Sequence, residues 1–72
     1  MKPKPSRPRE VERVVLGLGF VFLKSKGSHK VYRHPSGRIT GISFHPGDVP
    51  METLRGIIGE MGISIKQFND IV

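Results

Sequence analysis

The chain has 72 residues, no cysteine and a formal net charge of +6 at pH 7. A chain of this length forms at most one small domain, which buries only about 60% of its unfolded surface and leaves no room for a deep two-lobed active site. The lack of cysteine excludes disulfides, a thiol nucleophile and cysteine-ligated zinc. No segment has the roughly 20 apolar residues of a membrane span or the apolar run of a signal peptide, so we expect a cytoplasmic protein.

Residues 1–7 are predicted to be a disordered basic arm that buries nothing, because MKPKPSRP combines three prolines with three cations. A single domain is then expected over residues 8–72. Its first element is a helix from about Pro8 to Leu18, with a proline suited to the first turn and glycines at the exit. One face of this helix carries apolar residues at helical spacing: Val11, Val14, Val15 and Leu18.

Three short strands follow, joined by glycine-containing turns. Phe20–Leu23 is aromatic and β-branched and turns polar after Leu23, as a strand leaving the core would. Gly27 permits a tight reversal before a second strand at His29–His34, and Pro35-Ser36-Gly37 forms the next turn. The third strand is expected at Arg38–His45. Short connections of this kind predict an antiparallel meander.

A second helix is predicted over residues 51–61, with Gly62 just beyond its end. Its apolar residues at helical spacing are Met51, Leu54, Ile57, Ile58 and Met61. Ser64 and Gln67 have the spacing of a capping box, which would open a short final helical turn. Three residues of that turn are expected to face inward: Ile65, Phe68 and Ile71.

The resulting order is α-β-β-β-α with a terminal appendage, which predicts an α+β fold. Both helices should cover one face of the three-stranded antiparallel sheet, because so small a sheet can build only one core. The other face is left to solvent. Alternation puts His29, Val31 and Arg33 on one face and Lys30 and Tyr32 on the other, and it leaves open which of these faces is the core.

The positive charge is concentrated in the first half of the chain. Residues 1–38 hold ten of the twelve Lys and Arg residues and two acids, for a net charge of +8, whereas residues 39–72 have a net charge of −2. A one-sided positive potential attracts polyanions, above all nucleic acid, since each neutralised phosphate releases counterions. The alternative is that these cations only keep a small protein soluble.

Three histidines, His29, His34 and His45, accompany the cations. Imidazole can move a proton near neutral pH, and neighbouring cations can hold phosphate and stabilise transition-state charge. RNA supplies its own nucleophile, the 2′-OH, so these groups could cleave it without a metal. The acids are scattered, and histidine spacings of five and eleven residues match no common zinc pattern, so we expect no metal and no other cofactor.

Several fragments keep an order and spacing that resemble one known family. They are Leu18-Gly19-Phe20, Lys26-Gly27-Ser28-His29, Tyr32-Arg33-His34-Pro35, Phe44-His45-Pro46-Gly47, Thr53-Leu54-Arg55 and Met61-Gly62-Ile63-Ser64. Together they resemble the HicA toxins, also called YcfA-like proteins, over about residues 9–68. Three positions depart from the family's pattern, with Gly41 where a strand former is usual, Ser43 where many members have proline, and Glu52 where glycine is usual.

The resemblance implies a fold like the double-stranded-RNA-binding domain and the toxin of a type II toxin-antitoxin pair. Such a toxin is an endoribonuclease, an mRNA interferase that cleaves mRNA and is covered by a HicB antitoxin. The family's catalytic histidine carries over onto His29, with Lys26, Gly27 and Ser28 as its setting, and His45 matches a histidine with at most a supporting role. Contacts with RNA are expected from Lys24, Lys26, Ser28, Lys30 and Arg33.

Two other functions fit the same residues. A non-catalytic RNA-binding module of this fold could bind duplex RNA by shape alone. A protein-interaction domain could use the cations to meet an acidic partner. Cleavage of RNA would distinguish the endoribonuclease toxin from both of these functions.

Overall fold

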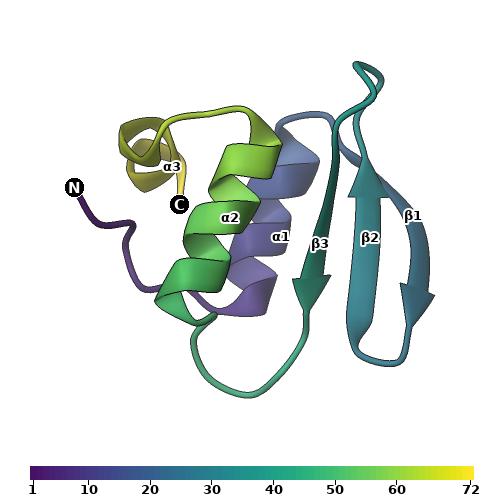
Figure 1. Ribbon diagram of the computed structural model, residues 1–72, viewed down its shortest axis with the longest axis horizontal. Helices are drawn as coiled ribbons and strands as arrows, with labels where there is room; N and C mark the ends of the chain where they lie inside the picture. The colour runs from purple at the N-terminus through teal and green to yellow at the C-terminus, as the bar shows by residue number, and fades with distance from the viewer.

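The computed structural model describes residues 1–72 and contains three helices and one three-stranded sheet. The elements are α1 (Pro8–Gly17), β1 (Val21–Lys26), β2 (His29–Arg33), β3 (Ile39–Ser43), α2 (Met51–Met61) and α3 (Ile65–Ile71). Figure 1 shows α1 and α2 on one side of the sheet, next to β3, with β1 at the far edge. The predicted α-β-β-β-α order and the antiparallel sheet are confirmed.

Residues at the N-terminal ends of α1 and α3 determine where these two helices begin. In α1, Pro8 occupies the first turn, and the backbone N–H of Arg7 donates to the Glu10 carboxylate at 2.8 Å. The predicted capping box of α3 is present, since Ser64 Oγ accepts from the backbone N–H of Gln67 at 3.0 Å and Gln67 Oε1 accepts from the N–H of Ser64 at 2.8 Å. None of these helices is long and apolar enough to cross a membrane.

The sheet is a meander in the order β1-β2-β3, with both pairs antiparallel. β1 runs to Lys26, three residues beyond the end that its sequence predicted at Leu23. The polar half of β1 buries nothing, but its backbone is held by pairing with β2, where Lys26 lies opposite His29. β2 ends at Arg33 and β3 spans five residues, so both are shorter than predicted.

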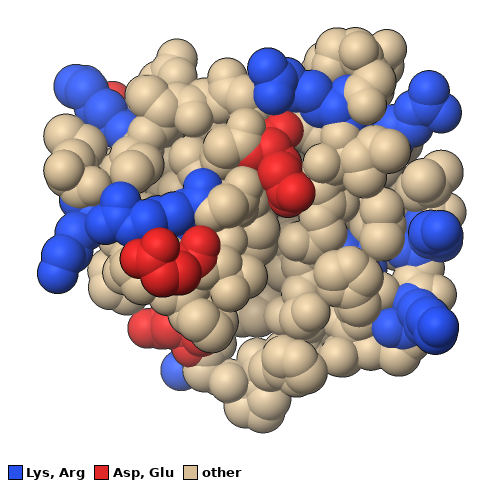
Figure 2. Space-filling view, viewed as in Figure 1, with Lys and Arg blue, Asp and Glu red and all other residues tan.

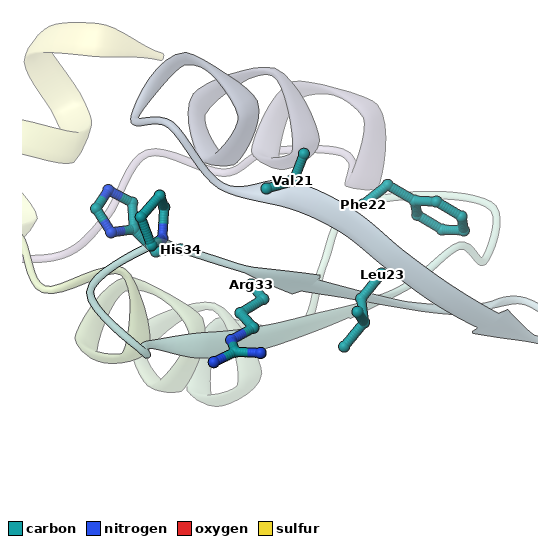
Figure 3. A pocket seen from close by; sticks show the side chains of 6 residues that line it. Val21, Phe22, Leu23, Arg33 and His34 are labelled. Atoms are coloured by element: carbon teal, nitrogen blue, oxygen red, sulfur yellow. The ribbon is translucent and has the colours of Figure 1, made fainter.

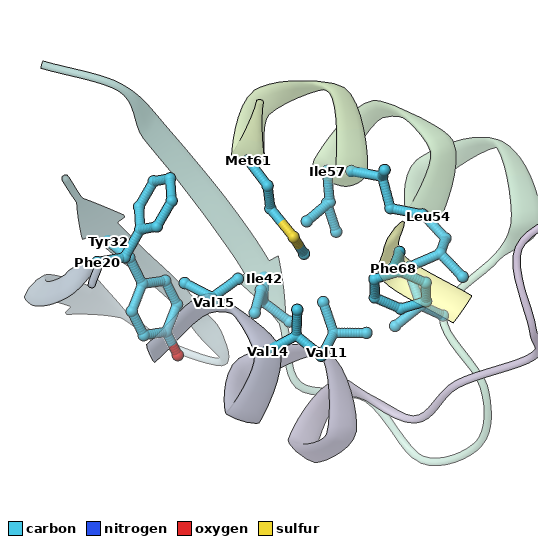
Figure 4. Packing of buried hydrophobic residues seen from close by; sticks show 12 residues of the cluster. Val11, Val14, Val15, Phe20, Tyr32, Ile42, Leu54, Ile57, Met61 and Phe68 are labelled. Atoms are coloured by element: carbon cyan, nitrogen blue, oxygen red, sulfur yellow. The ribbon is translucent and has the colours of Figure 1, made fainter. Parts of the chain in front are cut away.

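The core lies between the helices and the inner side of β2 and β3 (Figure 4). Its strand residues are Tyr32 and Ile42, both 0% exposed, so the core face of β2 is the face of Tyr32 and not that of Val31. The Tyr32 hydroxyl donates to the Glu12 carboxylate on α1. Burial first, and then the hydrogen bond and the charge of Glu12, raise the pKa of Tyr32 above its ordinary value, so the phenol keeps its proton even in alkaline solution where an exposed tyrosine would ionise.

The short helix α3 contributes one fully buried side chain, Phe68, to this core. Ile65 is half-buried against the same cluster. The expectation that Ile71 also faces inward is wrong, because its side chain is 53% exposed in the last turn of the helix.

Residues 1–7 form no helix or strand but lie against α3 and the loop that precedes α2. Pro3 and Ser6 are buried, which corrects the expectation that this stretch buries nothing. Asn69 holds this stretch in place. Its side-chain oxygen accepts from the backbone N–H of Lys4 at 2.8 Å, and its side-chain nitrogen donates to the backbone carbonyl of Lys2 at 3.1 Å. The N–H of Val49 adds a third tie, to the Ser6 carbonyl at 2.8 Å.

The glycine at position 56, in the middle of α2, predicts a stabilising substitution. A Cβ at Gly56 would meet no atom within 4 Å, so Gly56→Ala should raise the free energy of unfolding by about 1 kcal/mol through helix propensity alone. Gly62→Ala is the matched control and should lower it by about 1–2 kcal/mol, because Gly62 has φ +81° and its Cβ would lie 2.7 Å from the Arg38 guanidinium. Urea unfolding measures both, and a Gly56→Ala protein less stable than the parent would contradict the prediction.

Candidate active site

The register of the strands divides the sheet into an inner and an outer face. Cross-strand partners point to the same side, and Tyr32 and Ile42 mark the inner face because they are buried under the helices. The other side carries no helix (Figure 1), and we call it the outer face. Its side chains form three cross-strand rows, Lys26–His29–Ser43, Lys24–Val31–Gly41 and Val21–Arg33–Ile39.

A β-bulge at Leu23 brings two lysines onto this face. Val21 pairs with Arg33 and Phe22 with Tyr32, but the next pair is Lys24 with Val31, so Leu23 is an extra residue in β1. One extra residue reverses which side each later side chain faces. Without the bulge, simple alternation from Val21 would turn Lys24 and Lys26 toward the helices.

His29 opens β2 directly after a two-residue turn, Gly27-Ser28. The turn needs a positive φ at its first residue, and Gly27 supplies it with φ +59°. The imidazole is exposed on the outer face, between Lys26 of β1 and Ser43 of β3. Its Nδ1 lies 3.1 Å from Ser43 Oγ.

His34 is held in a different environment, away from His29. Its ring packs edge-on against Phe20, with ring centroids 5.1 Å apart. Its Nδ1 accepts from the backbone N–H of Ser36 at 3.0 Å, which fixes the turn that follows β2. His34 therefore has a structural role in this turn. Of His29 and His34, only His29 is exposed on the sheet.

Lys30 and Ser28, both expected to contact RNA, lie outside the three rows of the outer face. Lys30 points to the inner side, where its Nζ is 4.4 Å from the centroid of the Phe44 ring. Ser28 lies in the turn, and its carbonyl accepts from the backbone N–H of Phe44 at 2.8 Å. The outer face itself brings together Lys24, Lys26, His29 and Arg33.

His45 lies beyond the end of β3, exposed in the loop that leads to α2. It lines a groove of about 470 Å³ together with Phe44 and two arginines from the start of the chain, Arg7 and Arg9. The groove places two further cations beside this histidine. Sequence reasoning missed both arginines, because nothing in the sequence indicates that the start of α1 lies next to the end of β3.

A second hollow, of about 190 Å³, lies where β1 begins and β2 ends (Figure 3). It is lined by Val21, Phe22, Leu23, Arg33, His34 and Pro35. Arg33 is four residues from His29 along β2, so this hollow is roughly 13 Å from the His29 end of the sheet. It combines exposed apolar side chains with one cation.

The cations of the outer face are not neutralised by carboxylates. The two ion pairs in the structure are Glu52–Arg55 and Lys66–Asp70, and both lie on helices. Figure 2 shows Lys and Arg side chains on both sides of the molecule, whereas the acidic side chains visible in this view lie toward the helices and not on the strand side. No three His, Asp or Glu side chains lie close enough together to hold a metal ion. This face is therefore suited to bind an anion.

The fold and this face define a small basic α+β domain with an open sheet surface that bears one exposed imidazole among unpaired cations. Residues 8–63 match a protein family described as "HicA toxin of bacterial toxin-antitoxin". The chain belongs to the HicA toxin family, and it is accordingly the toxin of a toxin-antitoxin system, a role that implies an antitoxin partner. A comparison with curated proteins found no match.

Proposed function

We propose that the protein is a metal-independent endoribonuclease that cleaves mRNA, with His29 as its general acid or base. The proposal is supported most directly by the position of His29, an exposed imidazole on a sheet face whose cations have no carboxylate partners. Membership of a toxin family adds to this support.

The chemistry requires only the substrate and one proton-transfer group. The 2′ oxygen of a ribose bonds to the adjacent phosphorus while the bond from phosphorus to the 5′ oxygen breaks. The 2′-OH loses one proton and the 5′ oxygen gains one, so the products are a 2′,3′-cyclic phosphate and a 5′-hydroxyl end. His29 takes the first proton or supplies the second, and solvent completes the exchange.

The cations have two roles in this proposal. Lys26 is the neighbour of His29 in the first row, where an ammonium group can stabilise the charge that develops on the phosphate. Lys24 and Arg33 stand in the next rows and bind flanking phosphates. Ser28 contacts the RNA from the turn before β2, and Lys30 contacts only RNA that extends around this end of the sheet, because its side chain lies on the inner side.

The experiment is incubation of the purified protein with a long single-stranded RNA in excess EDTA. We expect loss of full-length RNA and products that end in a 2′,3′-cyclic phosphate, since the 2′-OH is the nucleophile. RNA that stays intact but is retarded on a native gel would replace the nuclease with a non-catalytic RNA-binding module. Cleavage that occurs only when a divalent metal is restored would overturn the metal-independent mechanism.

We also propose that the antitoxin is HicB-like and that it inhibits by covering the outer face. The unpaired cations Lys24, Lys26 and Arg33 favour a partner that presents acidic groups there. Such a partner would occlude His29 and the phosphate contacts at once.

A further inference from the structure

The imidazole of His29 is seated on the neighbouring strand. While its Nδ1 lies 3.1 Å from Ser43 Oγ, the adjacent edge of the ring, from Cε1 to Nε2, lies over Gly41. A Cβ at Gly41 would come within 2.7 Å of both Cε1 and Nε2. Nonbonded carbon atoms are at optimal separation at about 3.5–4.0 Å, so no side chain at position 41 is compatible with this position of the ring.

Gly41 has no other local reason to be glycine. It lies in the middle of β3, pairs regularly with Val31, and its φ is not positive. Glycine inside a strand weakens it and has no side chain to pack, and it commonly marks a close approach of another group. Here the group that approaches is the imidazole of His29.

Ser43 determines which ring nitrogen is left for a substrate. Its hydroxyl can accept a hydrogen bond from Nδ1–H in the neutral ring and also in the protonated ring. In the neutral ring this leaves the lone pair of Nε2 free to take a proton, and in the protonated ring it leaves Nε2–H free to give one. The same geometry thus serves a base and an acid.

We infer that Gly41 and Ser43 are positioning residues for His29, and that Nε2 is the atom that exchanges the proton with RNA. The inference rests on the proposed ribonuclease function. It gives a common purpose to the two residues of β3 that meet the ring, since the small residue clears space for the ring and the hydroxyl orients it.

The test compares Gly41→Ala, Ser43→Ala and Ser43→Thr with the parent, and uses Gly56→Ala as a control in which the new methyl group meets open space. Gly41→Ala should lower turnover about a hundredfold with the KM for RNA unchanged, because a ring displaced by about 1 Å loses its alignment. Ser43→Ala should lower turnover about tenfold, the value of one hydrogen bond, and Ser43→Thr should restore it. The three variants of β3 should unfold close to the parental urea midpoint, and Gly56→Ala at or above it.

Imidazole nitrogen signals measured by NMR give a readout that a general loss of stability would not move. Gly41→Ala and Ser43→Ala should shift the signals of His29 and leave those of His34 and His45 in place, whether or not RNA is cleaved. Unchanged His29 signals, or parental turnover in Gly41→Ala while His29→Ala is inactive, would overturn the inference and spare the proposed function. Parental cleavage by His29→Ala would instead refute the proposed function itself.

Discussion

Replacement of His29 by alanine is expected to lower the rate of RNA cleavage by about a hundredfold or more, the range that proton transfer by a side chain contributes. The side chain is exposed and its one hydrogen bond is to Ser43, so the free energy of unfolding should stay within about 0.5 kcal/mol of the parental value. The measurement is the single-turnover rate of formation of 2′,3′-cyclic phosphate ends, with urea unfolding of the same preparations.

Two variants sharpen this experiment. His29→Asn keeps a polar group that can bond to Ser43 but cannot exchange a proton near neutral pH, and it should be as inactive as alanine. His45→Ala removes the other exposed imidazole, in the loop after β3, and should cost less than about tenfold. If His45→Ala were inactive and His29→Ala active, the roles of the two histidines would be reversed.

Replacement of Phe68 by alanine is expected to lower the free energy of unfolding by about 3–5 kcal/mol. The ring is 0% exposed and belongs to the hydrophobic core, although α3 lies beyond residues 8–63, which match the family. A core of this size rarely supplies more than about 3–5 kcal/mol of net stability, so the variant should be largely unfolded at 25 °C. Circular dichroism and urea titration measure this directly.

The matched control is Ile71→Ala in the last turn of the same helix. Ile71 is 53% exposed, so its truncation should change the free energy of unfolding by about 0.5 kcal/mol or less. Equal stability of the Phe68→Ala protein and the parent would mean that α3 is an appendage, and that the folded domain ends before it.

The helices could be predicted from the sequence because their signals are local. The spacing of Val11, Val14 and Val15 defines one face of α1, and Ser64 with Gln67 forms a cap whose partners are three residues apart. The antiparallel meander follows for a similar reason, because its turns are short. In each case the interacting residues are neighbours in the chain.

The composition of the outer face could not be predicted in the same way. Alternation separates Lys30 and Tyr32 from His29, but only the packing of Tyr32 under the helices shows which face is the core. The bulge at Leu23 has no sequence signal, yet it decides that Lys24 faces outward.

The environment of His29 depends on the register between β2 and β3. Gly41 and Ser43 are twelve and fourteen residues from His29 in the chain, and they meet it only because His29 lies opposite Ser43. Nothing in the sequence itself connects these two residues with His29. In the structure they form the contact surface of the ring.

The position of β1 at the edge of the sheet has a consequence for self-association. β1 pairs only with β2, so its outer backbone groups are free, and Val21, Phe22 and Leu23 are each more than half exposed beside them. An apolar open edge of this kind can pair with the same strand of a second molecule and begin to aggregate. The charges of Lys24 and Lys26 on the same strand oppose that pairing. Any partner that neutralises the two lysines must therefore also shield the edge, or the toxin it holds will tend to precipitate.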